Sequence, residues 1–155
     1  MHEKLPAAKA SLTAFFTAVG VALGWKGIMV LAWAALMALD YITGTMAAMK
    51  EGQWSSKKAR EGAWHKCGAM IVVMVSGITD GILLLVCGNM PMLNIQWPEM
   101  ILPLILVWYI LTELGSILEN AIRLGANPPG WLAGMLEAGR RITEEAGSSA
   151  SDSLK

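Results

Sequence analysis

The pattern of apolar and polar positions divides this chain into four apolar blocks separated by short polar stretches. The blocks cover residues 10–25, 28–49, 67–88 and 99–118. A transmembrane helix needs about 20 consecutive, predominantly apolar residues, and the last three blocks meet that length. Residues 1–126 are therefore predicted to form an all-α integral membrane domain with three to four transmembrane helices. The turn Gly24-Trp25-Lys26-Gly27 predicts that the first two helices form an antiparallel hairpin.

The first block leaves two interpretations open. As a helix it is about 24 Å long, which is somewhat short for a span. One interpretation is a retained helix that crosses while thinning the bilayer. The other is a secretory signal, since residues 22–24 resemble a small-x-small cleavage site. If the block does not cross, the domain has three spans and an external N-terminus.

Residues 50–66 connect the second and third blocks and carry a basic excess. The positive-inside rule places this loop in the cytoplasm. Ser55 and Ser56 are candidate N-caps for a short helix through Trp64, and a plain solvated loop is the alternative. The basic residues that set the predicted topology are Lys50, Lys57, Lys58, Arg60 and Lys66.

The polar C-terminal region follows a break at residues 127–130, which read Asn-Pro-Pro-Gly. Residues 127–146 alternate an apolar stripe with charged positions, which predicts an interfacial amphipathic helix. Residues 147–155 are predicted to be a disordered tail. With the loop 50–66 inside, the C-terminus is also cytoplasmic.

Composition supports a membrane protein and excludes several other classes. Hydrophobic residues make up 55% and charged residues 15% of the chain, and the net charge is +0. Soluble domains have about one quarter charged residues. The two cysteines and two histidines form no metal-ligating pattern. We expect no cofactor, no metal, no enzymatic activity and no nucleic-acid partner.

Three acids, Asp40, Asp80 and Glu113, lie within the apolar blocks. A charged side chain at the bilayer centre costs about 2.5–3.5 kcal/mol, so such acids must face one another, other subunits or water. Counted from residues 50 and 66, Asp40 and Asp80 differ in depth by only about 6 Å and are expected to share a proton. The acids are either hydrogen-bonded contacts between helices or residues that line an aqueous lumen in one state.

Small residues provide candidate helix-packing surfaces. Gly77 and Gly81 form a GxxxG pair, and Gly44 and Ala48 offer a similar face on the preceding span. This spacing lets two helix backbones approach closely in a membrane.

Three motifs together resemble the phage lysis and toxin-secretion holin family of Gram-positive systems. The first is the start Asp-Tyr-x-x-Gly at Asp40, Tyr41 and Gly44, and the second is Ser-Ser-Lys-Lys at residues 55–58. The third is the block that contains Glu113, Ser116, Glu119 and Asn120. The resemblance runs from about residue 39 to residue 129.

This resemblance implies a small multi-pass protein of the host bacterial cytoplasmic membrane. Its partners would be the lipid bilayer, further copies of itself, an endolysin and an antiholin. It would accumulate, oligomerise and open a lesion through which an endolysin or a toxin crosses, which gives timed lysis of the host. Two alternatives stay open: a regulatory antiholin, and a transporter or channel subunit that uses Asp40 or Glu113 as a proton or cation site.

Overall fold

The computed structural model describes residues 4–90, 92 and 96–153, with side chains from residue 24 onward. Its four helices are α1 (Lys4–Lys50), α2 (Ser56–Asn89), α3 (Ile101–Leu124) and α4 (Gly130–Asp152), and no strand occurs in the described residues. Three segments are long and apolar enough to cross a membrane: Gly24–Lys50, Ser56–Asn89 and Ile101–Leu124. The predicted all-α class with three apolar spans is confirmed.

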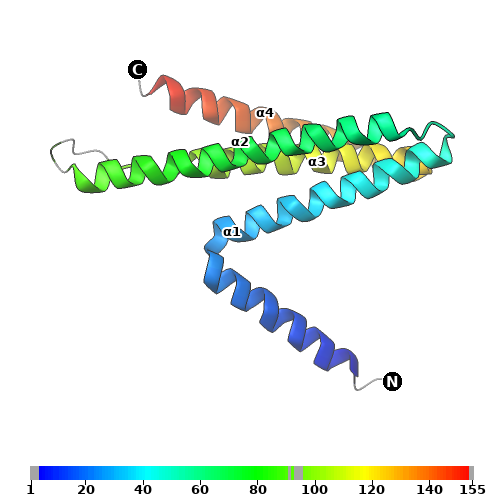
Figure 1. Cartoon of the computed structure of the whole chain (residues 1–155), viewed down its shortest axis with the longest axis horizontal. Helices are drawn as coiled ribbons and strands as arrows, with labels where there is room; N and C mark the ends of the chain where they lie inside the picture. Colours follow the sequence, from blue (N-terminus) through cyan, green and yellow to red (C-terminus); the bar gives the residue numbers. More distant parts are fainter. Residues whose placement is uncertain (1–3, 91, 93–95, 154–155) are drawn as a thin grey trace.

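Gly24 divides α1 into two parts. Its backbone angles, φ 64° and ψ −178°, lie in a region that only glycine adopts readily. Residues 25–27 are helical, so a kink at one residue replaces the predicted turn. Figure 1 shows the part before Gly24 turning away from the other helices and not packing as one arm of a hairpin. The question of whether residues 10–25 cross a membrane falls largely on residues whose side chains are not described.

The central helix is α3, which packs against α1, α2 and α4, whereas α1 and α2 make few contacts with each other (Figure 1). The buried core joins Trp33 and Met37 of α1 to Ala69 and Val73 of α2 through Leu106 of α3. Leu106 is fully buried. The bundle therefore depends on α3 for its cohesion.

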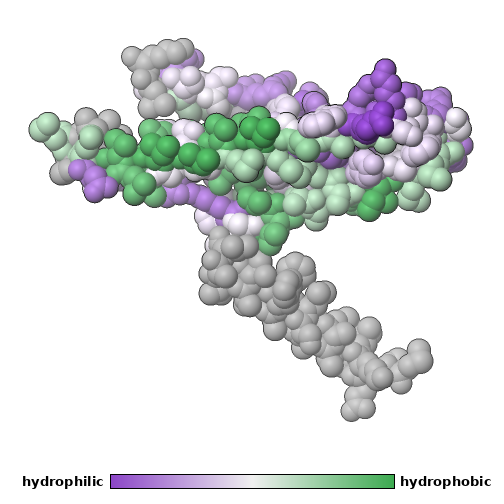
Figure 2. Space-filling model, viewed as in Figure 1, coloured by the Kyte–Doolittle hydropathy of each residue, from purple (hydrophilic) through white to green (hydrophobic). Residues whose placement is uncertain are grey.

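The outward faces of the bundle are apolar. Large hydrophobic side chains on α1 and α2 are exposed, among them Ile42, Met46, Ile71, Ile78 and Leu85. Figure 2 shows apolar residues gathered along the body of the bundle and hydrophilic residues concentrated at one end. Exposed apolar surface of this extent indicates contact with lipid or with other subunits.

We call the hydrophilic end, where residues 51–55 and 125–129 connect the helices, the basic end. Ser55 caps α2, with its hydroxyl oxygen accepting a hydrogen bond from the Lys57 amide at 3.3 Å. The helix then continues without a break to Asn89 instead of ending at Trp64. The predicted loop over residues 50–66 is therefore confined to residues 51–55, and the prediction is wrong for residues 56–66, because most residues after Ser55 favour a helix.

After α3, Gly125 adopts a left-handed conformation at φ 106° and ends the helix. From Gly130, α4 turns back along α3, whereas the sequence predicted a helix lying flat at the membrane surface. It reaches Asp152, so residues 147–152 of the predicted disordered tail are helical. Residues 154 and 155 lie outside the described part of the chain.

Candidate functional site

A buried ion-pair cluster joins the three spans at one level. The Nζ atom of Lys66 on α2 lies 3.0 Å from Oδ2 of Asp40 on α1 and 2.7 Å from Oε2 of Glu113 on α3. The three side chains are only 18%, 18% and 10% exposed. Two carboxylates face one ammonium, so the cluster carries an excess negative charge when all three are ionised.

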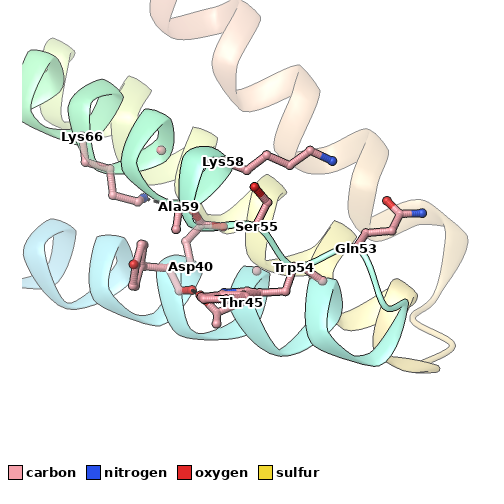
Figure 3. A pocket seen from close by; sticks show the side chains of 12 residues that line it. Asp40, Thr45, Gln53, Trp54, Ser55, Lys58, Ala59 and Lys66 are labelled. Atoms are coloured by element: carbon pink, nitrogen blue, oxygen red, sulfur yellow. Dashed lines mark hydrogen bonds and ion pairs between the residues drawn. The ribbon is translucent and has the colours of Figure 1, made fainter.

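The helices bring these groups together because each lies at a similar distance from the basic end. Asp40 is ten residues from the end of α1, Lys66 ten residues from the start of α2, and Glu113 eleven residues from the end of α3. At 1.5 Å per residue, all three are about 15–17 Å from that end. Figure 3 shows Asp40 and Lys66 on facing sides of the space between α1 and α2.

Hydrogen bonds extend the cluster to the surface at the basic end. Asn120 Nδ2 donates to Asp40 Oδ1 at 2.9 Å, and Arg123 Nη1 donates to Asn120 Oδ1 at 3.2 Å. Arg123 also makes two hydrogen bonds to Glu51, from Nε at 3.0 Å and from Nη2 at 2.7 Å. A continuous polar network therefore runs from Glu51 through α3 to Glu113.

Glu51, the outermost residue of this network, has a lowered pKa. The hydrogen bond from Arg123 holds the pKa of the Glu51 carboxyl below its ordinary value. Glu51 thus stays ionised, and the pair remains formed, at any pH at which a free glutamate is ionised.

Gly44 leaves room for Asn120 to approach α1. A Cβ atom at Gly44 would lie 3.3 Å from Asn120 Nδ2, tighter than an ordinary contact. The small-residue surface that the sequence predicted at Gly44 is therefore occupied by the Asn120 side chain of the same chain and not by a second copy. Ala48, its partner in the motif, lines a groove between α1 and α2.

This groove opens beside the ion-pair cluster and has a volume of about 190 Å³. Figure 3 shows Trp54 and Thr45 beside it and Asp40 and Lys66 at its inner end. The groove exists because the residues that line it on both helices are small: Gly44, Ala48, Ala59 and Gly62.

Asp80 lies elsewhere and caps the start of α3. Its Oδ1 accepts hydrogen bonds from Trp97 Nε1 at 2.8 Å and from the Ile101 amide at 3.2 Å. Its Oδ2 accepts from the Leu102 amide at 2.8 Å. It is fourteen residues from Lys66, so about 21 Å along the bundle separates Asp80 from the level of Asp40. The predicted proton sharing between Asp40 and Asp80 is wrong, because Lys66 lies inside the bundle and not at its edge.

The GxxxG glycines have different surroundings. A Cβ atom at Gly77 would lie 3.7 Å from Leu102 Cδ2, so this glycine faces α3. A Cβ atom at Gly81 would meet no atom within 4 Å. Of these two glycines, Gly81 is therefore the one with open space for a second molecule.

The remaining residues of the third motif divide between two faces of α3. Asn120 faces α1, while Ser116 and Glu119 line a cavity of about 350 Å³ between α3 and α4. Tyr41 is 45% exposed on the outside of α1.

Among the predicted topology residues, Lys57, Lys58 and Arg60 are exposed on the first turns of α2. Lys50 donates hydrogen bonds to the carbonyls of Arg123 and Leu124, at 3.3 and 2.7 Å, and so satisfies the end of α3. At the opposite end, Lys26 pairs with Glu99.

A family model of bacteriophage holins matches residues 17–140 of this sequence. The chain belongs to the bacteriophage holin family.

A curated relative of this holin-family chain is an uncharacterized protein of Halalkalibacterium halodurans. The two are 33% identical over 94 residues, which are 61% of this chain and 64% of the relative. The chain thus matches less than two thirds of that relative's length. No solved structure matches. The family supports a phage holin role in general and is not a family of enzymes.

The position of Lys66 in this holin-family chain differs from the prediction, which places it at the edge of a loop. Lys66, Ala69, Val73, Ser76 and Asp80 nevertheless recur at helical spacing. Apart from Lys66, which is largely buried, all are buried on one face of α2. That spacing was the available signal. The ion pair of Arg123 with Glu51 could not be predicted from spacing, because Arg123 lies on α3 and Glu51 follows α1.

Proposed function

We propose that this holin-family chain accumulates in the bacterial cytoplasmic membrane, oligomerises, and opens a lesion through which an endolysin or a toxin crosses. The observation that carries the proposal is the buried network of Asp40, Lys66 and Glu113 within three membrane-length helices. Lys66 pairs with both acids inside one chain, which lowers the cost of inserting these charges before any lesion forms. Opening requires a second packing in which polar groups meet water.

The positive-inside rule supports an orientation with the basic end in the cytoplasm. Exposed Lys57, Lys58 and Arg60 gather there, whereas Lys26 at the opposite end is paired with Glu99. A cysteine at Lys58 should react with an impermeant maleimide only after permeabilisation, and one at Gln96 should react in intact spheroplasts. Both variants need Cys67 and Cys87 replaced by serine, and the reverse pattern would overturn the orientation.

The cluster favours a holin over a cation-coupled transporter. The ammonium of Lys66 occupies the position between Asp40 and Glu113 that a transported cation would need. A transporter using these acids would have to displace it during every cycle.

Timed lysis tests the function directly. Co-expression of the chain with a cytoplasmic endolysin should give abrupt lysis after a fixed delay, whereas neither protein alone should lyse the cells. Equal amounts of chain should accumulate in membranes with and without endolysin. Continued growth of the co-expressing cells at normal membrane levels of the chain would contradict the proposal.

A further inference from the structure

The groove between α1 and α2 has the shape and charge of a site for a small molecule. It lies near the basic end, between two helices that make few contacts with each other. Its walls are Gly44 and Ala48 on α1 and Ala59 and Gly62 on α2, and no side chain fills its volume of about 190 Å³. Atoms that line a void lose van der Waals contacts, so an occupant of suitable shape would gain them.

The length of the groove matches one leaflet of a bilayer. It extends from Trp54 near the basic end to Asp40 and Lys66 at its inner end (Figure 3). Asp40 is ten residues from the end of α1, a distance of about 15 Å. This is half of the hydrocarbon thickness of about 30 Å. A helix of a second copy would continue along α1 or α2 through both leaflets, whereas one acyl chain ends near the midplane, where the groove also ends.

The inner part of the groove suits an apolar chain. Both carboxylate oxygens of Asp40 have partners, because Oδ2 lies 3.0 Å from Lys66 Nζ and Oδ1 accepts from Asn120 Nδ2 at 2.9 Å. The hydroxyl of Thr45 donates to the Tyr41 carbonyl at 2.8 Å. These polar groups therefore need no hydrogen bond from an occupant.

The outer part of the groove carries a free positive charge. Lys58 lines the groove and is exposed. The acids nearest to it in sequence are Glu51, which is paired with Arg123, and Glu61, which is paired with Lys57. Within the described part of the chain Lys58 itself forms no ion pair. Its ammonium is therefore available to an anion.

Trp54 places this outer part at the boundary between membrane and water. Its side chain is 53% exposed, and tryptophan is enriched at the level of the lipid headgroups. Figure 3 shows the Lys58 side chain directed away from Lys66, toward the basic end. Basic pockets between transmembrane helices bind the headgroups of anionic lipids. We propose that the groove binds one anionic phospholipid, with its phosphate at Lys58 and one acyl chain between α1 and α2.

Lipid binding of this kind goes beyond the proposed function, because it requires only that the three spans lie in a membrane. The acyl chain would add contacts between α1 and α2 where the protein has few. Phosphatidylglycerol should therefore raise the unfolding temperature of the purified full chain in zwitterionic detergent by several degrees. Phosphatidylcholine should have a much smaller effect, and equal effects of the two lipids would overturn the proposal.

Native mass spectrometry of the full chain tests the position of the phosphate. With added phosphatidylglycerol, the spectrum should show mainly one retained lipid per chain. Lys58→Gln should reduce this retention several-fold. Lys57→Gln is the matched control, because it removes the same charge from an adjacent exposed position that does not line the groove. Equal retention by the two variants would contradict the assignment of Lys58.

A leucine placed in the groove tests the position of the acyl chain. A Cβ atom at Gly62 would meet no atom within 4 Å, so Gly62→Leu occupies the groove without displacing a side chain. Gly68→Leu is the matched control, because its surroundings are equally open and it lies outside the groove on the same helix. Retention of phosphatidylglycerol should fall several-fold in the Gly62 variant and stay at the wild-type level in the Gly68 variant. Wild-type retention in both variants would exclude an acyl chain from the groove.

Photolabelling of the wild-type chain in vesicles requires no substitution. Phosphatidylglycerol with a diazirine in the middle of one acyl chain should label the groove at Gly44, Ala48, Ala59 and Gly62, and unlabelled phosphatidylglycerol should compete. Equal labelling of Met46, which is exposed on the outside of α1, would show only general contact with lipid and would overturn the site.

These measurements use no endolysin, so their outcome is independent of lysis. Loss of retention in the Lys58 and Gly62 variants supports the lipid site even if the wild-type chain fails to lyse co-expressing cells. Wild-type retention in both variants overturns the site, and normal lysis then leaves the proposed function standing. If Gly62→Leu instead abolishes crosslinked dimers and keeps lipid retention, a second copy occupies the groove and the proposal is wrong.

Discussion

Lys66 and Glu113, which lie on different helices, form a buried ion pair with a separation of 2.7 Å between Nζ and Oε2. Asp40 completes the cluster from a third helix. The three spans are thus joined by one lysine at a level about 15 Å inside the bundle.

Removing this lysine should destabilise the bundle strongly. Lys66→Met leaves two facing carboxylates without a cation, and breaking a buried pair in this way costs about 3–5 kcal/mol. We expect a lower unfolding temperature in detergent micelles and reduced accumulation in membranes. Lys57→Met is the control, because the Lys57 side chain is 80% exposed. Combining Lys66→Met with Asp40→Asn and Glu113→Gln should recover most of the stability, and an unaltered single variant would exclude a stabilising role of the cluster.

Asp40→Asn should separate assembly from triggering. The asparagine oxygen can still accept the hydrogen bond from Asn120, and Lys66 keeps Glu113 as its partner. The substitution neutralises the excess negative charge, so the closed packing should persist longer. We expect normal membrane levels and oligomers with delayed or absent lysis, followed as culture density against time. Asp40→Ala should behave similarly with lower levels, and normal timing in both variants would remove Asp40 from the mechanism.

Asp80 should act on the start of α3 alone. Asp80→Ala removes the acceptor for the amides of Ile101 and Leu102, and the loss of a helix cap costs about 0.5–2 kcal/mol. Hydrogen exchange should accelerate at residues 101–104 while residues 113–120 keep their protection. Asp80→Asn retains one oxygen and should give a smaller effect. Equal acceleration along all of α3 would show that Asp80 supports the whole helix.

Leucine substitutions should distinguish the two glycines of the GxxxG pair. Gly77→Leu places a large side chain toward Leu102 and should lower the unfolding temperature of the single chain. Gly81→Leu meets open space, so it should preserve that temperature and reduce crosslinked oligomers only if copies pack there. Wild-type oligomers in the Gly81 variant would show that this face is not a contact between copies.

Much of the fold follows from the sequence because membrane spans are determined by local composition. Apolar blocks of spanning length predicted the three helices, and Ser55 was correctly named as a candidate cap. Which residues of different helices lie at the same level could not be predicted in this way, because it depends on contacts between distant segments. The sequence predicts Lys66 at the membrane edge, because a charge beside polar neighbours resembles a loop when its partners lie on other helices.

The same reasoning explains the outcome for α4. Its alternating faces predicted a helix, but amphipathic character alone does not distinguish a membrane surface from a neighbouring helix as its partner. The choice depends on the small residue Gly139 meeting Leu111 and on Glu144 reaching Trp108. These are pairings between distant segments, and neither is visible in one segment.

The dependence of the bundle on α3 also sets an order of events during biosynthesis. The ribosome delivers α1 and α2 first, and these helices contact each other little except through the pair of Asp40 and Lys66. Until α3 emerges, Trp33 and Val73 have no Leu106 between them, and Lys66 has one carboxylate instead of two. Nascent chains therefore remain two loosely associated helices for about 35 residues of further synthesis, counted from Asn89 to Leu124, which at about 5–20 residues per second is a few seconds. During that interval the membrane insertion machinery, and not the packing of the protein itself, must keep Asp40 and Lys66 away from lipid.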